Sequence, residues 1–182
     1  MQKKIALISL VSFSFIILPA FGHAQRKISA YLFSQYNKTL YDRTRGNNPW
    51  GYGLGLQATL NTKTMFKPMV EITGDLYHED DKVLRLNPDG SFPTQDNTLN
   101  EMVNLFAGAA FSPIPEIYIM MAAGPSFIGG KNLFGIKPGI GFYFSKSQRV
   151  TAKLSYINIF NRDKLSGKDF GSLSMGLGVK LF

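Results

Sequence analysis

The chain has 182 residues, a formal net charge of +8 at pH 7 and no cysteine. This length predicts a single domain, and the lack of cysteine excludes disulfides and thiolate metal sites. A basic balance can indicate nucleic-acid binding, but no basic stripe or nucleic-acid motif accompanies it, so we expect no nucleic acid among the partners. Phosphorylated lipid headgroups are the expected counter-charge.

The first 24 residues predict a signal peptide. Lys3 and Lys4 precede an apolar run over residues 5–21, and the small residues Gly22 and Ala24 stand at the −3 and −1 positions of a cleavage site. We expect an exported protein with its signal over residues 1–24 and its barrel domain over residues 25–182. An uncleaved membrane anchor is the alternative. No later apolar run reaches the ~18 residues that a membrane helix needs.

Eight segments with period-two alternation follow the signal, and each is long enough for a tilted membrane strand. They run over residues 26–37, 50–60, 67–79, 99–111, 117–128, 134–144, 148–160 and 171–182. Their connections alternate between long and short, except for the short connection 129–133, which falls where a long one is expected. This pattern predicts an all-β fold, an eight-stranded antiparallel transmembrane β-barrel with up-and-down meander topology. The short turns would be periplasmic and the long loops external.

One face of most segments is apolar, and the other is built mainly from small residues. In the second segment, Trp50, Leu54 and Leu60 share one face, whereas Gly51 and Gln57 share the other. A soluble barrel with an apolar interior would need a charged exterior on every strand, so small residues fit a tight lumen better. We therefore assign the apolar faces to lipid, with a soluble eight-stranded barrel as the alternative.

Aromatic residues fall near both predicted ends of the segments, as the two interfacial belts of a membrane barrel require. The outer belt is predicted to contain Trp50, Tyr52, Phe127, Phe134 and Phe160, and the periplasmic belt Phe66, Phe111, Phe142, Phe144 and Phe182. Chance clustering is the alternative, because the chain is rich in aromatic residues throughout.

The signal, the eight segments and the terminal Phe182 resemble the small outer-membrane β-barrel family typified by OmpA and OmpX. The stretches 134–144 and 156–162 also resemble outer-membrane barrel proteins of the Bacteroidetes. The resemblance implies the outer membrane of a Gram-negative bacterium, with its lipids, lipopolysaccharide and barrel-assembly machinery as partners. One departure concerns the assembly signal, in which the final Phe shares its face with apolar residues, whereas Gly178 and Lys180 occupy those positions here.

Several charged residues fall on the faces assigned to the lumen, which the side chains of an eight-stranded barrel just fill. Because an unpaired buried charge is very costly, such charges need partners. We predict a lumen-spanning ion network that plugs the barrel, centred on the carboxylates of the third segment. Its members would be Glu71, Asp75, Lys137, Arg149, Lys153 and Lys180. The alternative is that some of these side chains point to the rims.

Three functions are compatible with such a barrel. We expect a structural or surface-interaction role, carried by the loops 38–49, 80–98 and 161–170, with the surface ligand unknown. A narrow pore for small or apolar solutes is the alternative, supported by an apolar stretch of the lumen around Phe106 and Met120. A lipid A-modifying enzyme is the third.

Neither catalysis nor a bound cofactor or metal is expected. The deacylase type of barrel carries a His-x-Ser-Asn run on its seventh strand, and residues 154–159 contain no histidine. The mature chain has one histidine, His78, and no nucleophile accompanies it. The run 78–81 could bind a divalent cation, but it lacks regular ligand spacing and is interpreted as a solvated acidic loop.

Overall fold

A computed structural model describes residues 27–41, 50–79, 98–128, 131–163 and 168–182. The predicted signal over residues 1–24 lies outside these ranges, so its prediction stays untested. No helix in the described part of the chain has the length and hydropathy needed to cross a membrane.

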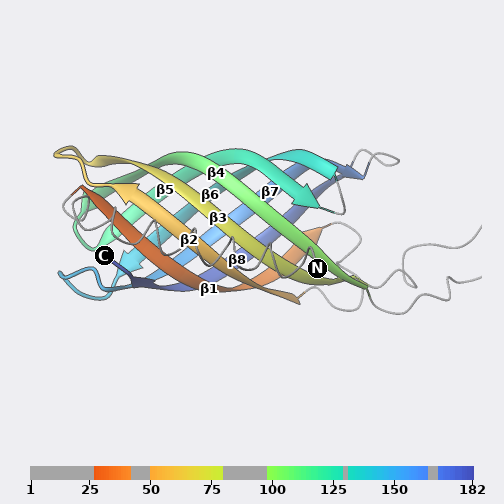
Figure 1. The fold of residues 1–182 in the computed structure, drawn as a ribbon, viewed down its shortest axis with the longest axis horizontal. Coiled ribbons are helices and arrows are strands. Elements are labelled where there is room, and N and C mark those ends of the chain that lie inside the picture. The colour runs from red at the N-terminus through yellow and green to blue at the C-terminus, as the bar shows by residue number, and fades with distance from the viewer. Residues whose placement is uncertain (1–26, 42–49, 80–97, 129–130, 164–167) are drawn as a thin grey trace, which may run out of the picture.

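Eight antiparallel strands close into one barrel, in which each strand pairs with its neighbours in sequence and β1 pairs with β8 (Figure 1). The predicted fold class and meander topology are therefore confirmed. The strands are β1 (Ile28–Tyr41), β2 (Trp50–Leu60), β3 (Phe66–Glu79), β4 (Thr98–Ile114), β5 (Ile117–Ile128), β6 (Lys131–Tyr143), β7 (Val150–Asp163) and β8 (Lys168–Lys180).

We name the two ends of the barrel after their connections. The turn end holds the short connections β2–β3, β4–β5 and β6–β7, together with the start of β1 and the end of β8. The loop end is the opposite one, where β1 ends and β2 begins. In Figure 1 the turn end lies to the left.

The predicted bounds of β2 and β5 are confirmed, whereas β7 begins two residues later than predicted. Gln148 adopts a left-handed backbone conformation with φ 53°, which interrupts the extended chain. The amide of Gln148 donates to the carbonyl of Ser145 at 2.9 Å, and Phe144 donates to Val150 at 3.1 Å. Residues 145–149 therefore form a closed turn, and the strand starts at Val150.

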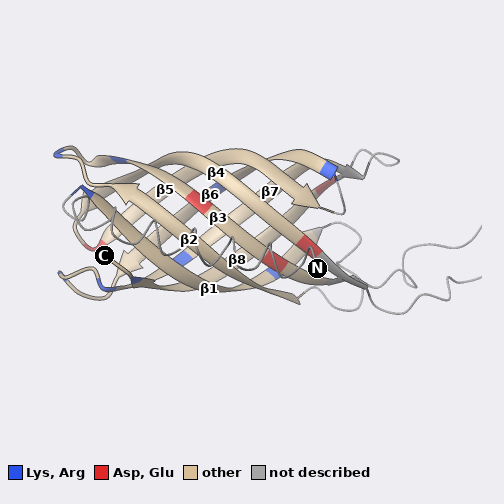
Figure 2. Ribbon diagram, in the orientation of Figure 1, with Lys and Arg blue, Asp and Glu red and all other residues tan. Residues whose placement is uncertain are grey.

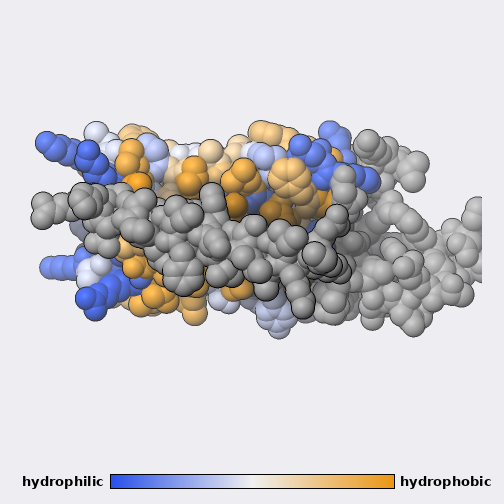
Figure 3. Space-filling view, in the orientation of Figure 1, coloured by the Kyte–Doolittle hydropathy of each residue, from blue (hydrophilic) through white to orange (hydrophobic). Residues whose placement is uncertain are grey.

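The outer wall of the barrel is apolar and the lumen is closely packed. Residues at alternate positions are exposed, and the exposed ones are mainly large hydrophobic side chains, such as Leu54 at 63% and Met175 at 67%. Figure 3 shows hydrophobic side chains between two hydrophilic ends. Water does not favour such a continuous apolar surface on a monomer, whereas lipid does. The strands are therefore transmembrane strands.

Two prolines interrupt the ladders that flank the β5–β6 hairpin. Pro125 in β5 pairs with Phe134 of β6, but the β4–β5 pairing is broken at its level, and Pro138 in β6 breaks the β6–β7 pairing in the same way. Proline has no amide hydrogen, so it cannot donate to the neighbouring strand. The β5–β6 ladder itself is continuous from Ile117 to Ile128.

Large lumen side chains are accommodated over glycines of neighbouring strands. A Cβ on Gly178 would lie 2.6 Å from the ring of Phe33, and a Cβ on Gly141 would overlap the ring of Tyr118. Because the rings already occupy this space, these two positions tolerate no side chain without movement of the rings. The lumen face is thus more aromatic than the predicted set of Gly, Ser and Thr.

Candidate functional site

A buried ion cluster occupies the middle of the lumen, and Glu71 of β3 lies at its centre. The carboxylate of Glu71 accepts a hydrogen bond from Lys153 Nζ of β7 at 2.5 Å and forms a second ion pair with Lys137 of β6. Lys153 also donates to Gln57 Oε1 at 3.1 Å. The three charged residues are at most 2% exposed. The cluster therefore connects opposite walls of the barrel across its lumen.

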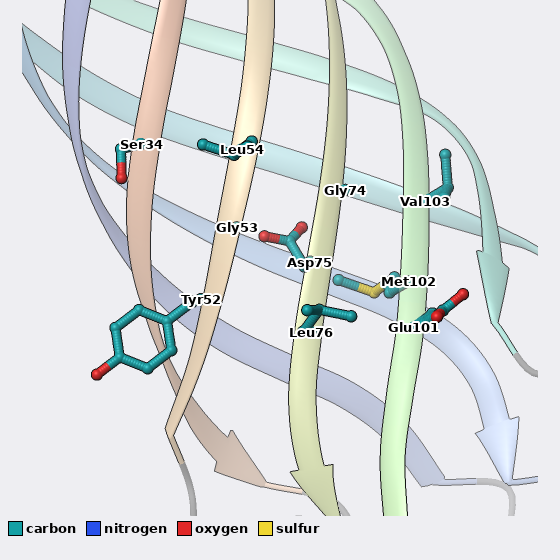
Figure 4. A pocket seen from close by; sticks show the side chains of 10 residues that line it. All are labelled: Ser34, Tyr52, Gly53, Leu54, Gly74, Asp75, Leu76, Glu101, Met102 and Val103. Atoms are coloured by element: carbon teal, nitrogen blue, oxygen red, sulfur yellow. The ribbon is translucent and has the colours of Figure 1, made fainter. Parts of the chain in front are cut away.

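Asp75, four residues beyond Glu71 on the same face of β3, is held by neutral donors. Its carboxylate accepts hydrogen bonds from Gln35 at 2.5 Å, Asn37 at 2.7 Å, and Thr73 and Asn104 at 3.1 Å each. Figure 4 shows Asp75 beside Gly53 of β2, where a Cβ would collide with the carboxylate. Four hydrogen bonds compensate this charge for the water it has lost.

The buried charges of the described chain balance one another. Glu71 and Asp75 are the buried acids, and Lys137 and Lys153 are the buried bases. Figure 2 shows acidic and basic positions of the strands between the two ends of the barrel. A neutral set of this kind avoids the cost of a net charge in a region of low dielectric constant.

Two apolar clusters enclose the ion cluster. Toward the turn end, Tyr143 packs against Tyr31 and Tyr118 with ring centroids 6.0 and 5.0 Å apart. Toward the loop end, the ring of Tyr77 packs edge-on against Phe170 at 5.1 Å within a second buried cluster. Phe106 and Met120, the residues that suggested a pore, are buried members of these two clusters.

Arg149 and Lys180, which the sequence assigned to the ion network, do not join it. Arg149 is exposed in the turn after β6, and Lys180 is half-buried at the last position of β8. The backbone amide of Lys180 donates to the carbonyl of Arg149 at 2.8 Å, so both residues lie at the turn end. The cluster in the structure is correspondingly smaller than predicted and includes the neutral partners of Asp75, which the sequence did not indicate.

Apart from Phe182, the residues predicted as aromatic belts lie on the outer wall near the two ends of the strands. At the loop end, Phe134 and Phe160 stack with centroids 6.2 Å apart, and Trp50, Tyr52 and Phe127 are exposed. At the turn end, Phe66 contacts Phe111 at 4.9 Å, and Phe142 contacts Phe144 at 5.6 Å. Phe182 follows the end of β8 and is half-buried.

Tyr36 is an aromatic residue of the loop end that the sequence reasoning missed. Its ring stacks on Trp50 at 5.0 Å and meets Tyr52 edge-on at 4.9 Å, and Lys38 Nζ lies 5.0 Å from the Trp50 ring. The sequence did not show which face of the first strand points outward, because both of its faces are partly aromatic. Its pairing with Trp50–Leu60 resolves which face is outward.

A depression of about 500 Å³ on the outer wall lies over β1 to β4 (Figure 4). Gly74 leaves its floor without a side chain, and Leu54, Leu76 and Val103 form its sides, with Glu101 at one edge. A second depression of about 380 Å³ lies over β5 to β8 and is almost entirely apolar. Both belong to the wall that faces lipid, and neither brings together a nucleophile and a base.

The described residues contain no group of three or more His, Cys, Asp or Glu side chains that could hold a metal ion. The predicted acidic run 78–81 falls outside this statement, because the side chains there are not described. Ser155, in the β7 region compared with deacylase barrels, faces the lumen at 2% exposure and is not on the lipid side.

Comparisons with known proteins identify the fold. No family model matches the chain, and no curated protein matches it in sequence. Two structures of Ail, the attachment invasion locus protein of Yersinia pestis, are similar to it. One is a crystal structure with the heparin analogue sucrose octasulfate, which aligns with a TM-score of 0.55 and 13% identity over 85% of this chain and 98% of Ail.

The other is a backbone structure of Ail in a phospholipid bilayer nanodisc, with a TM-score of 0.56 and 11% identity over 84% of this chain and 99% of Ail. Neisserial surface protein A aligns with a TM-score of 0.49 and 14% identity over 84% of this chain and 96% of that protein. At this level of identity the likeness to Ail concerns the fold alone. Together with the closed ring of eight strands and the apolar wall, it shows that the chain has the fold of the small eight-stranded outer-membrane β-barrels.

Proposed function

We propose that the protein is a non-enzymatic barrel of a Gram-negative outer membrane that presents its loop-end segments to surface partners while its lumen stays closed. The observation that carries this proposal is the buried ion cluster of Glu71, Lys137 and Lys153, which lies in the lumen between two apolar clusters. A barrel that conducts no solute can still bind partners through the segments at its ends, and loops on a rigid scaffold commonly contain binding sites.

The placement in the outer membrane rests on the fold and on the sequence. Closed barrels of transmembrane strands with short turns at one end are the outer-membrane pattern, and residues 1–24 read as an export signal. In this placement the turn end faces the periplasm, the loop end faces outward, and lipopolysaccharide surrounds the outer half. Assembly would use the barrel-assembly machinery of that membrane.

The likeness to Ail supports a surface-contact role but not a particular ligand. Ail has been crystallised with a heparin analogue, a sulfated and strongly anionic molecule. In this chain the segments 42–49, 80–97 and 164–167 contain basic and acidic residues in equal number. Such a composition gives no net attraction for a polyanion, so the chemical class of the ligand is not carried over.

Planar-bilayer recordings test the closed lumen. The purified barrel is expected to give no stable conductance steps in concentrated KCl, whereas a variant with Glu71, Lys137 and Lys153 all replaced by Ala serves as the opened control. Stable steps from the parent protein, in proportion to the amount inserted, would establish the narrow-pore alternative and overturn the closed barrel.

Epitope insertion tests the presentation of the loop end. A short epitope inserted within residues 80–97 should bind antibody on intact cells, and the same epitope in the β2–β3 turn should bind only after the outer membrane is permeabilised. The reverse result would contradict the orientation. Unchanged lipid A composition in cells that overproduce the protein is the expected control result, since a changed composition would support the enzyme alternative.

A further inference from the structure

Among the described side chains, positive charge is in excess at one end of the barrel. At the turn end the described basic residues are Lys27, Lys63, Lys67, Lys146, Arg149 and Lys180, and the described acidic side chain there is Glu116. Figure 2 shows several of these basic positions at the left end of the ribbon. Among the described side chains, the two signs balance in the lumen and at the loop end, so the excess of positive charge belongs to the turn end.

The loop end provides the contrast. Its described charged side chains include Lys38 and Lys131 on the basic side and Glu101 and Asp169 on the acidic side. The segments 42–49, 80–97 and 164–167 add equal numbers of each sign. The positive charge of the turn end is therefore not a general property of the exposed surface of this chain.

Most of the turn-end cations are exposed and have no acidic partner among the described residues. Lys27, Lys63, Lys146 and Arg149 are exposed, and the ion pairs recorded between described residues are the two at Glu71 in the lumen. Charges that are left without a counter-ion by the protein attract one from outside. The turn end thus offers an open positive rim.

The rim stands at the depth of lipid headgroups. Phe66, Phe142 and Phe144 lie on the outer wall directly before it, and such aromatic girdles mark the boundary between hydrocarbon and headgroups. Lys63 precedes Phe66 by three residues, and Lys146 follows Phe144 by two. In Figure 3 the hydrophobic band gives way to hydrophilic atoms at this end.

The cations extend around most of the rim, and the β4–β5 turn, which holds Glu116, is the part of the described rim without one. They come from the start of β1, the β2–β3 turn, the β6–β7 turn and the end of β8. A protein partner would bind a basic patch on one side of the barrel, whereas the lipid headgroups of a leaflet surround the barrel and would contact cations along the rim. We propose that the turn end binds the headgroups of anionic phospholipids, whose phosphodiesters pair with Lys63, Lys146, Arg149 and Lys27.

The proposal rests on a membrane-spanning barrel and not on the closed lumen, so the conductance test and this one can fail separately. The probe is phosphatidylglycerol, compared with zwitterionic phosphatidylcholine, each carrying a spin label on its acyl chain. The fraction of motionally restricted label at the barrel in mixed vesicles gives the relative association constant of the two lipids by electron paramagnetic resonance.

A single basic residue near an anionic surface changes an association constant about fivefold. We therefore expect the association constant of the parent protein for phosphatidylglycerol to exceed that for phosphatidylcholine by at least about threefold, which is less than the full effect of one such residue. The variant Lys63→Gln/Lys146→Gln/Arg149→Gln should lose this preference, and the parent should lose it in about 0.5 M salt. The matched variant Lys38→Gln/Lys131→Gln removes cations from the loop end and should keep it.

Equal association of the two lipids with the parent protein would overturn the proposal, as would an undiminished preference in the turn-end variant. An equal loss in the loop-end variant would also overturn it, since the preference would then follow total charge. Heat-modifiable gel mobility checks that each variant is folded. The replaced side chains are exposed, so this check is expected to be passed.

Discussion

Replacing Glu71 by Gln should destabilise the barrel strongly, because it removes the only carboxylate that pairs with Lys137 and Lys153 in the described lumen. Both lysines are at most 2% exposed and cannot reach water without movement of the wall. Removing one partner of a buried ion pair costs about 3–5 kcal/mol, since the charge that remains is uncompensated. Here two like charges remain, so we expect the upper half of that range.

The measurement is equilibrium unfolding by urea in lipid vesicles, followed by the fluorescence of Trp50 and by gel mobility. With a typical dependence of about 2 kcal/mol per molar urea, a loss of about 4 kcal/mol lowers the midpoint by about 2 M. Glu101→Gln is the matched control, because this glutamate is exposed on the outer wall. Its midpoint should move by no more than about 0.5 kcal/mol in equivalent free energy.

A second variant separates loss of charge balance from loss of packing. Glu71→Gln/Lys153→Met removes one charge of each sign and should recover at least about 1 kcal/mol relative to Glu71→Gln, because neighbouring charges couple. If Glu71→Gln unfolds at the same urea concentration as Glu101→Gln, or if the double variant is less stable than the single one, the ion cluster does not contribute as argued.

Further predictions concern the packing at two glycines, a strand hydrogen bond at Pro138 and the membrane depth of Trp50. Gly141→Ala should cost about 1–3 kcal/mol because its Cβ would overlap the ring of Tyr118, whereas Gly74→Ala, with nothing within 4 Å, should leave the urea midpoint unchanged. Pro138→Ala should restore a ladder donor, stabilise the barrel by up to about 1 kcal/mol and slow amide hydrogen exchange in facing β7. Trp50, the only tryptophan, should be quenched more by bromine near the headgroups than by bromine deep in the acyl chains.

The fold and the centre of the ion cluster could be predicted from the sequence because both follow from alternation. Parity assigns Glu71, Lys137 and Lys153 to the lumen without knowledge of register, and the cost of an unpaired charge then requires them to meet. The bounds of β2 and β5 were also accessible, since clear alternation begins and ends at the same residues as the strands.

The level of each lumen side chain along the barrel axis could not be predicted in this way. Parity says which face a residue occupies, but strand tilt and the register of each pair decide which side chains lie at one level. The amides of Gln35, Asn37 and Asn104 reach Asp75 because β2 pairs with both β1 and β3 and because β3 pairs with β4, and no single segment reveals these registers. Arg149 was misplaced for a local reason, the left-handed backbone at Gln148 that delays β7.

The ion cluster also gives the barrel a means of fixing its register. A slip of one residue in a strand turns every side chain to the opposite face, which would bring Lys137 or Lys153 into contact with lipid. A lysine on the lipid face near the bilayer midplane costs about 2–4 kcal/mol, and the slip would also break the pairs with Glu71. Apolar lumen residues of the same volume could not discriminate in this way, because lipid accepts them. The native pairing bears the desolvation cost of these charges, but wrong pairings bear the lipid exposure of a lysine and the loss of its partner as well, which accounts for charged residues in the middle of a lumen that is otherwise rich in Phe and Tyr.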